Sequence, residues 1–160
     1  MIRPLAGFTI GVYPDLSYGL LAGITFGGWG FFVKGRSNLH TQRADYACLS
    51  NGTTEEGFFW SGDDRTVTRH QIAIDVSYAV WKPVSLYLGA GYGSRALCWK
   101  DSEDRWARVS DRSYRGPSLE AGLLIHPLQK GPARGLTLLL GGTWIPRQYL
   151  DAEAGFAWRF

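Results

Sequence analysis

Three histidines are the side chains of this sequence that could act as general bases in a reaction. A reaction of that kind needs a nucleophile and an orienting acid within hydrogen-bond reach of the histidine. His126 is expected apart from the other two, as an interfacial residue at a turn. His40 and His70 would share one end of the fold predicted below with Ser61, Asp63, Asp64, Ser110 and Asp111. Because no spacing among these residues fixes a catalytic geometry, the sequence predicts no catalytic residue and an enzyme is kept as the alternative.

The two cysteines, Cys48 and Cys98, leave two interpretations open. Both would face an oxidising exterior, where cysteine pairs form disulfides, and a bridge would add about 4 kcal/mol by the loop-entropy model. Two free or separately buried thiols are the equal alternative. No metal site is predicted, because two cysteines and scattered histidines lack the ligand spacing of a zinc site. No cofactor is predicted either.

Nine charged residues stand at positions that alternate with apolar ones. If the apolar positions point outward, these charges point into a narrow interior, where opposite charges can pair. The functional interpretation is a selective conduit or a proton path. We favour the structural one, a paired network that fills the interior, because buried charges must be matched. The nine residues are Lys34, Arg36, Arg69, Asp75, Arg95, Glu120, Asp151, Glu153 and Arg159.

The alternation itself predicts the elements that position these charges. Strict period two indicates a strand with one apolar and one polar face. In the last segment, the apolar face holds Leu150, Ala152, Ala154, Phe156, Trp158 and Phe160, and Asp151, Glu153 and Arg159 lie on the other face. The same parity predicts seven further strands within residues 6–12, 18–26, 29–36, 71–80, 86–95, 118–125 and 136–144.

The composition of the two faces predicts that the strands cross a membrane. Large apolar and aromatic residues occupy one face, whereas Gly, Ala, Ser, Thr and the charges occupy the other. A soluble lipocalin-like barrel, the alternative here, would turn the large apolar face inward. Most strands approach the 9–11 residues that cross a bilayer at a tilt, and eight strands leave interior room only for side chains or one small ligand. We therefore expect an all-β protein, an eight-stranded antiparallel up-and-down transmembrane β-barrel that occupies residues 1–160 as a single domain.

Composition and connections agree with this prediction. The chain has 21 glycines and 14% aromatic residues, with a net charge of +3 that comes from mixed-sign clusters. No basic run suggests a nucleic-acid partner, and no apolar stretch reaches the 18–20 residues of a membrane helix. The long connections, 38–65 and 99–114, fall on the extracellular side. Short turns at Gly27-Gly28 and Lys82-Pro83, with a longer one at 126–135, fall on the periplasmic side.

The C-terminal residues resemble a known signature. Phe156, Trp158 and the terminal Phe160 are similar to the assembly signal of bacterial outer-membrane β-barrels, and the whole chain resembles a small eight-stranded barrel of that superfamily. The run 88–93 and the segments Trp106-Ala107 and 111–116 are similar to barrel domains of Bacteroidota surface proteins. The resemblance implies the outer membrane of a Gram-negative bacterium and insertion by the barrel-assembly machinery. Because Met1-Ile2-Arg3-Pro4 is no signal peptide, we expect a leader to be missing from this sequence.

The function expected from these observations is non-enzymatic. The barrel, with its lumen filled, would act as a structural or interaction subunit at the cell surface, alone or in a larger envelope complex. Outer-membrane lipid and other envelope proteins are the expected partners. The long connection 99–114 mixes charges with two tryptophans, so Trp99, Arg105 and Trp106 are expected to face a partner. The alternative is an outer-leaflet lipid-modifying enzyme of the acylase or deacylase type.

Overall fold

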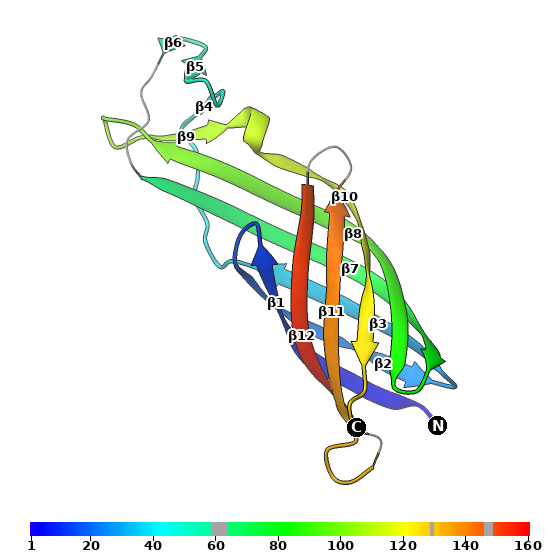
Figure 1. Ribbon diagram of the computed structural model, residues 1–160. Helices are drawn as coiled ribbons and strands as arrows, with labels where there is room; N and C mark the ends of the chain where they lie inside the picture. Colours follow the sequence, from blue (N-terminus) through cyan, green and yellow to red (C-terminus); the bar gives the residue numbers. More distant parts are fainter. Residues whose placement is uncertain (59–63, 129, 146–148) are drawn as a thin grey trace.

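A closed barrel of eight antiparallel strands forms most of the molecule (Figure 1). The computed structural model describes residues 1–58, 64–128, 130–145 and 149–160. Each barrel strand pairs with the one that follows it in the barrel, β12 pairs with β1, and β10 pairs with β8 across the connection between them. The predicted up-and-down topology is therefore confirmed. The barrel strands are β1 (Arg3–Tyr13), β2 (Ser17–Phe26), β3 (Trp29–Ser37), β7 (Arg65–Trp81), β8 (Val84–Lys100), β10 (Tyr114–Ile125), β11 (Leu136–Ile145) and β12 (Tyr149–Arg159).

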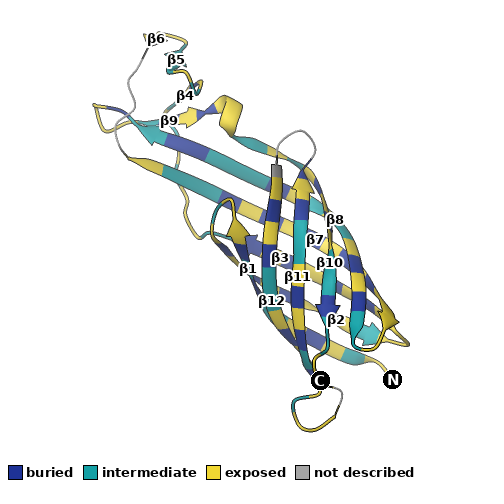
Figure 2. Ribbon diagram, viewed as in Figure 1, coloured by how far each residue is buried: buried dark blue, intermediate teal, exposed yellow. Residues whose placement is uncertain are grey.

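The two faces of these strands differ as the sequence predicts. Exposed and buried residues alternate along each strand (Figure 2). On β7, Ile74 is 65% exposed while its neighbour Ala73 is 1% exposed. Large apolar side chains thus lie on the outside of the barrel, and the charged positions lie inside. A soluble protein does not expose so much contiguous apolar surface, so the soluble lipocalin-like alternative is wrong.

Short turns join the strands at the end that carries both chain termini (Figure 1). Gly27 and Gly28 connect β2 to β3 with φ angles of 54° and 90°, a backbone conformation that glycine adopts without steric cost. Lys82 and Pro83 connect β7 to β8, and residues 126–135 connect β10 to β11. In outer-membrane barrels short turns face the periplasm, so we name this end the periplasmic end.

The opposite, extracellular end carries a folded extension. Strands β7 and β8 have 17 residues each and continue well beyond their neighbours. The connections expected to be loops there contain short strands of their own. β4 pairs in parallel with β9, and β9 pairs antiparallel with β8. These elements are β4 (Tyr46–Cys48), β5 (Thr53–Thr54), β6 (Gly57–Phe58), β9 (Trp106–Val109) and the 3₁₀ turn η1 (Ser110–Arg112).

Helical structure contributes little to the described part of the chain. The three-residue turn η1 is its only helical element, and no described helix has the length and apolar composition of a membrane span.

Candidate functional site: a filled lumen and an arginine-lined outer mouth

Lys34 stands at the centre of the ion network that fills the extracellular half of the lumen. Its Nζ atom lies 2.5 Å from Glu120 Oε2 and 3.7 Å from Asp75 Oδ2, and it also donates to Glu153. All four side chains are at most 2% exposed. Strand parity accounts for this meeting, because each residue occupies an inward position on a different strand.

Two arginines continue the network toward the extracellular end. The Nη2 atom of Arg36 donates to Asp151 Oδ2 at 2.7 Å, and Arg69 donates to the same oxygen. The neutral side chain of Gln71 links the parts, accepting from Arg36 at 2.8 Å and donating to Glu120. Three cations and four carboxylates therefore meet in the buried lumen of the described barrel, with charge-assisted hydrogen bonds between them.

An apolar layer closes the periplasmic half of the lumen. Phe32 and Tyr87 meet edge-on with ring centroids 5.7 Å apart, and the Tyr87 hydroxyl donates to Glu153 Oε1 at 2.6 Å. Tyr87 lies so close to the opposite wall that a Cβ on Gly141 would be 1.8 Å from its hydroxyl oxygen. The ion network thus rests on a packed layer formed by Leu5, Leu21, Phe32, Tyr87, Leu124, Leu139 and Ala157.

Of the nine charges predicted to share the lumen network, seven do so and two lie elsewhere. Arg95 lies at the outer mouth and pairs with Asp15, which the sequence interpretation did not include. Arg159 lies at the periplasmic mouth, below the apolar layer. Parity places a side chain on the inner face, but it does not say at which depth. Gln71 and Thr143 also belong to the network, and the sequence did not point to them because neither side chain carries a charge.

The outer mouth of the barrel is lined by arginines. A cavity of about 300 Å³ lies between Asp15, Arg65, Arg95 and Arg112, with Pro14, Val67 and Leu97 completing its wall. Arg95 Nε lies 2.5 Å from Asp15 Oδ2. Arg65 and Arg112 are exposed, and among the described residues neither forms an ion pair. The lining of this cavity therefore holds three arginines and one carboxylate.

The extension above this mouth has a small core of its own. Strands β4, β8 and β9 bury Cys48, Leu97, Ala107 and Val109, and Tyr46, Val67 and Trp99 pack against this cluster. The backbone N–H of Ser50 donates to Asp111 Oδ1 at 2.8 Å and ties the two long connections together. Apolar packing and cross-connection pairing give the extension a defined shape.

Asp101 organises the tip of the extension. Its oxygens accept the backbone N–H groups of Glu103 at 2.8 Å and Arg105 at 2.9 Å, and the Tyr46 hydroxyl at 2.8 Å. Burial alone would raise the pKa of Asp101, but these hydrogen bonds hold it below its usual range. Burial and the hydrogen bond to Asp101 raise the pKa of Tyr46 to about 12.

The two cysteines are free thiols, so the disulfide alternative is wrong for this structure. Cys48 on β4 lies opposite Val109, and Cys98 on β8 lies opposite Arg108, so that β9 runs between them. Strands that are not direct neighbours are about 10 Å apart, whereas a disulfide needs Cα atoms about 4.4–6.8 Å apart. Burial raises the pKa of the Cys48 thiol, which makes it a structural rather than a reactive group.

The histidines do not form a catalytic arrangement in the described part of the chain. His70 Nδ1 lies 3.0 Å from Ser37 Oγ at an exposed position, and no described carboxylate completes the pair. His40 contacts Asn38 through its backbone only. Ser61 and Asp63, considered as partners for these histidines, lie outside the described residues.

The three residues expected to face a partner differ in their surroundings. Trp99 is partly buried and packs against the apolar cluster of the extension, and its contact with a partner stays a prediction. Arg105 is half exposed but pairs with Asp101 and Glu103 and lies over the Tyr46 ring. For Arg105 and the half-buried Trp106, contact with a partner stays a prediction.

Known structures share this fold. Ail, the attachment invasion locus protein of Yersinia pestis, in complex with the heparin analogue sucrose octasulfate, matches with a TM-score of 0.58 at 14% identity, over 99% of this chain and 97% of that one. The same Y. pestis outer membrane protein in a phospholipid bilayer nanodisc gives 0.52 at 16% identity, over 98% and 99%. Neisserial surface protein A gives 0.48 at 13% identity, over 99% and 96%. No family model and no curated protein matches the chain.

At these identities the likeness concerns the fold. The chain has the fold of the small eight-stranded outer-membrane barrels. Its apolar exterior is the surface that such a barrel turns toward the lipid of the bacterial outer membrane. The narrower resemblance to Bacteroidota surface barrels and the assembly role of Phe156, Trp158 and Phe160 stay predictions, although all three side chains lie exposed on the outer face.

Proposed function

We propose that this chain is a non-enzymatic cell-surface binding protein that recognises sulfated or phosphorylated saccharides at its outer mouth. The observation that carries the proposal is the cavity at this mouth, where Arg65, Arg95 and Arg112 meet a single carboxylate, Asp15. Guanidinium groups match the oxygens of sulfate and phosphate with two parallel hydrogen bonds.

Charge balance at the mouth supports an anionic ligand. Asp15 is already occupied, because Arg95 donates to both of its carboxylate oxygens, at 2.5 and 3.2 Å. The backbone oxygen of Asp15 also accepts from Arg69 at 3.1 Å, which fixes the loop that carries the carboxylate. Arg65 and Arg112 remain to attract a ligand, at an exposed position where electrostatic steering raises the rate of encounter.

The surroundings hold this mouth in shape before a ligand arrives. The ion network forms its floor, and the paired strands β4, β8 and β9 stand above it. Binding to preformed groups loses less conformational entropy than binding to loops that must first become ordered. One structural neighbour, Ail, has been solved with a sulfated saccharide analogue. That binding belongs to Ail, and here it supports only the choice of ligand class.

Binding of sucrose octasulfate to the protein in lipid nanodiscs tests the proposal. We expect saturable binding by calorimetry that weakens with salt, and at least a tenfold weaker affinity for the double variant Arg65→Gln/Arg112→Gln. Lys130→Gln/Arg134→Gln is the matched control, because it removes two exposed charges from the periplasmic turn. Equal affinity in all three proteins, or no binding to the wild type, would overturn the proposal.

Two further expectations concern the whole barrel rather than one of its sites. Insertion by the barrel-assembly machinery and membership in a larger envelope complex stay predictions, and an affinity purification from native membranes tests the second. No contact among the described residues favours the lipid-modifying alternative over the binding function.

A further inference from the structure

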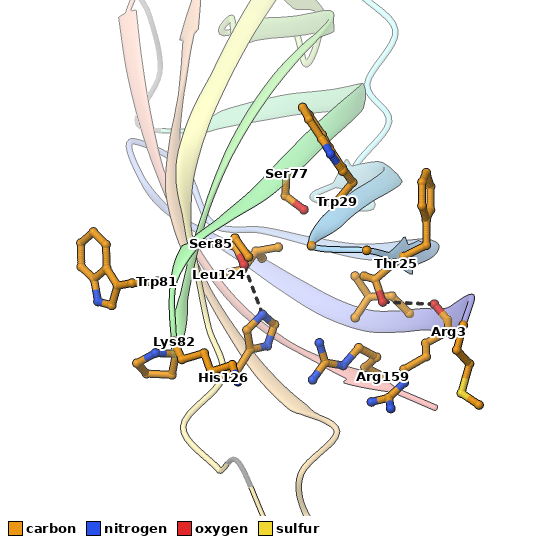
Figure 3. Close-up of a pocket in the computed structure, with 17 residues that line it drawn as sticks. Arg3, Thr25, Trp29, Ser77, Trp81, Lys82, Ser85, Leu124, His126 and Arg159 are labelled. Carbon is orange, nitrogen blue, oxygen red and sulfur yellow. Dashed lines mark hydrogen bonds between the residues drawn. The ribbon is translucent and has the colours of Figure 1, made fainter.

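The periplasmic mouth of the barrel contains a second cavity, at the opposite end from the proposed binding site. It has a volume of about 280 Å³ and lies between the ends of β1, β10 and β12 and the turns that join β2 to β3 and β7 to β8 (Figure 3). Leu5 and Leu124, which belong to the apolar layer of the lumen, close it from above. We call this cavity the cup: apolar side chains close its inner end, and its other end opens toward the periplasm.

Positive charge lines this cup without a matching carboxylate. Arg3, Lys82 and Arg159 are among its lining residues, and Asp and Glu are not. The imbalance extends to the whole periplasmic end: residues 1–8, 21–33, 76–88, 122–139 and 155–160 contain five Lys and Arg residues and none of the fourteen acidic residues. Among the described residues, no salt bridge involves any of the three lining cations, so no acidic side chain pairs with the positive charge of the cup.

Two of the cations lie close together at the open end. Arg159 is within electrostatic reach of both Arg3 and His126, and Figure 3 shows its side chain between theirs. The Nε atom of Arg159 is buried and makes no hydrogen bond to the described residues. A buried donor without a partner is costly, and like charges held side by side repel each other. Both features are relieved when an oxyanion binds between the guanidinium groups.

His126 forms the inner wall of the cup and is held in place by hydrogen bonds. Its Nδ1 atom lies 2.9 Å from Thr137 Oγ1 and its Nε2 atom 3.4 Å from Ser85 Oγ. Burial and the charge of Arg159 lower the pKa of His126 to about 4. The imidazole is therefore neutral at neutral pH, so it adds no further positive charge beside Arg3 and Arg159.

From this geometry we infer that the periplasmic mouth is a binding site for a phosphate group, held between Arg3 and Arg159 with Lys82 on the rim. Paired guanidinium groups are suited to phosphate oxygens. Trp29 and Trp81, which also line the cup, are of the type that settles at the membrane interface, so the mouth opens at the depth of the lipid headgroups. The phosphate comes either from a phospholipid of the periplasmic leaflet or from a soluble phosphate ester.

Titration with inorganic phosphate tests the site itself. The protein is held in a maltoside detergent, which contains no phosphate, and binding is followed by calorimetry. We expect Arg3→Gln and Lys82→Gln each to weaken binding severalfold, and Arg3→Gln/Arg159→Gln to weaken it at least tenfold. The control Arg134→Gln, an equal loss of charge outside the cup, should leave the affinity within twofold. Arg159 is the last residue of β12, and its substitution could impair folding of the double variant. In that case Arg3→Gln and Lys82→Gln, which leave Arg159 in place, still test the site.

The pKa of His126, measured by NMR, gives a readout that a purely structural role of the arginines would not move. Bound phosphate offsets the charge of Arg159, so the pKa of His126 should rise as phosphate is added. An unchanged pKa at saturating phosphate, or no binding to the wild type, would overturn the inference.

A second arm separates the two sources of phosphate. The protein is released from nanodiscs that contain phosphatidylglycerol, and native mass spectrometry records any lipid that stays bound. Retention by the wild type but not by Arg3→Gln/Arg159→Gln assigns the site to a phospholipid. Binding of inorganic phosphate without lipid retention assigns it to a soluble ester. Because the outer mouth is unchanged in these variants, we expect the binding of sucrose octasulfate at that mouth to be unaffected whichever result is obtained.

Discussion

Lys34 pairs with three carboxylates, more than either arginine of the described lumen network does. It contacts Glu120, Glu153 and Asp75 and also lies 4.6 Å from the centroid of the Tyr87 ring. The carboxylates around it are not equally placed. Both oxygens of Asp75 lack a hydrogen-bond partner among the described residues, and only Lys34, at 3.7 Å, compensates its charge. Removing the cation and removing this one anion should therefore have opposite consequences.

Lys34→Met should destabilise the folded barrel by about 3–5 kcal/mol, because it leaves three buried carboxylates without their common cation. Asp75→Asn keeps the shape of the side chain and brings the lumen from four carboxylates to three, matching the three cations. We expect the free energy of unfolding of this variant to be equal to or above that of the wild type. Urea unfolding in lipid vesicles compares the two, and a greater loss for Asp75→Asn would show that the network is balanced differently.

The hydrogen bonds of Asp101 and Asp111 should make the extension sensitive to acid. The pKa of Asp111 is held down chiefly by the hydroxyl of Ser50, and that of Asp101 by the donors around it. A lowered pKa contributes stability that is present above the unfolded value near 3.9 and is lost as the pH falls through the folded pKa. NMR signals of β4 and β9 should therefore broaden on acidification before those of the barrel. Asp101→Asn/Asp111→Asn should remove this acid step, and an unchanged step would assign it to other groups.

At the scale of strands, the two-residue period decides which side chains meet lipid. A strand of 17 residues is about 56 Å long, so β7 and β8, even tilted by 45°, exceed the apolar band of about 25 Å that an outer-membrane barrel presents. The surplus length carries the extension. Within the band, each one-residue step turns a side chain from lipid to lumen.

Arginine at Ile74 or Leu138 should destabilise the barrel by about 2–4 kcal/mol near the bilayer midplane, because both side chains lie exposed on the outer face. Ala73→Ser changes a buried, inward neighbour and should cost much less. Folding into lipid vesicles measures each variant. If tolerance to charge along β7 and β11 showed no period of two, the assignment of the outer face to lipid would be wrong.

Strand parity made most of the barrel predictable. The position of a side chain along the barrel axis and the pairing of distant segments could not be predicted. The inward positions of Phe32, Lys34 and Tyr87 follow from their neighbours alone. The separate locations of Arg95 and Arg159 do not, because parity carries no information on distance along the barrel axis. The pairing of β4 with β9 joins segments some 60 residues apart whose short strands have no distinct period. Gln71 was missed for another reason: as a neutral side chain it gives no sign in the sequence that it bridges charges.

At the scale of the whole molecule, the lumen consists of two layers that block it in succession. The ion network fills the extracellular half, and the ring pair of Phe32 and Tyr87 closes the half below it. The cavities at the two mouths lie on opposite sides of this plug. The described lumen is therefore blocked along its length, with a separate cavity at each end.

Protein reconstituted in a planar bilayer should give no discrete, long-lived conductance steps, because the interior of an eight-stranded barrel is filled by side chains. The protein should also migrate differently on gels before and after boiling, which serves as the control that it is folded in the measured sample. Stable single-channel steps from folded protein would contradict the two-layer lumen.

The segregation of acidic residues gives the molecule a large permanent electric dipole along the barrel axis. The periplasmic segments carry five positive charges, whereas the remaining twelve Lys and Arg residues and fourteen acidic residues give the rest of the chain a net charge of −2. A barrel with this charge distribution has an energetically preferred direction in any field across a membrane. Its orientation is therefore encoded by charge as well as by loop size, and the positive pole is the end that bears both chain termini.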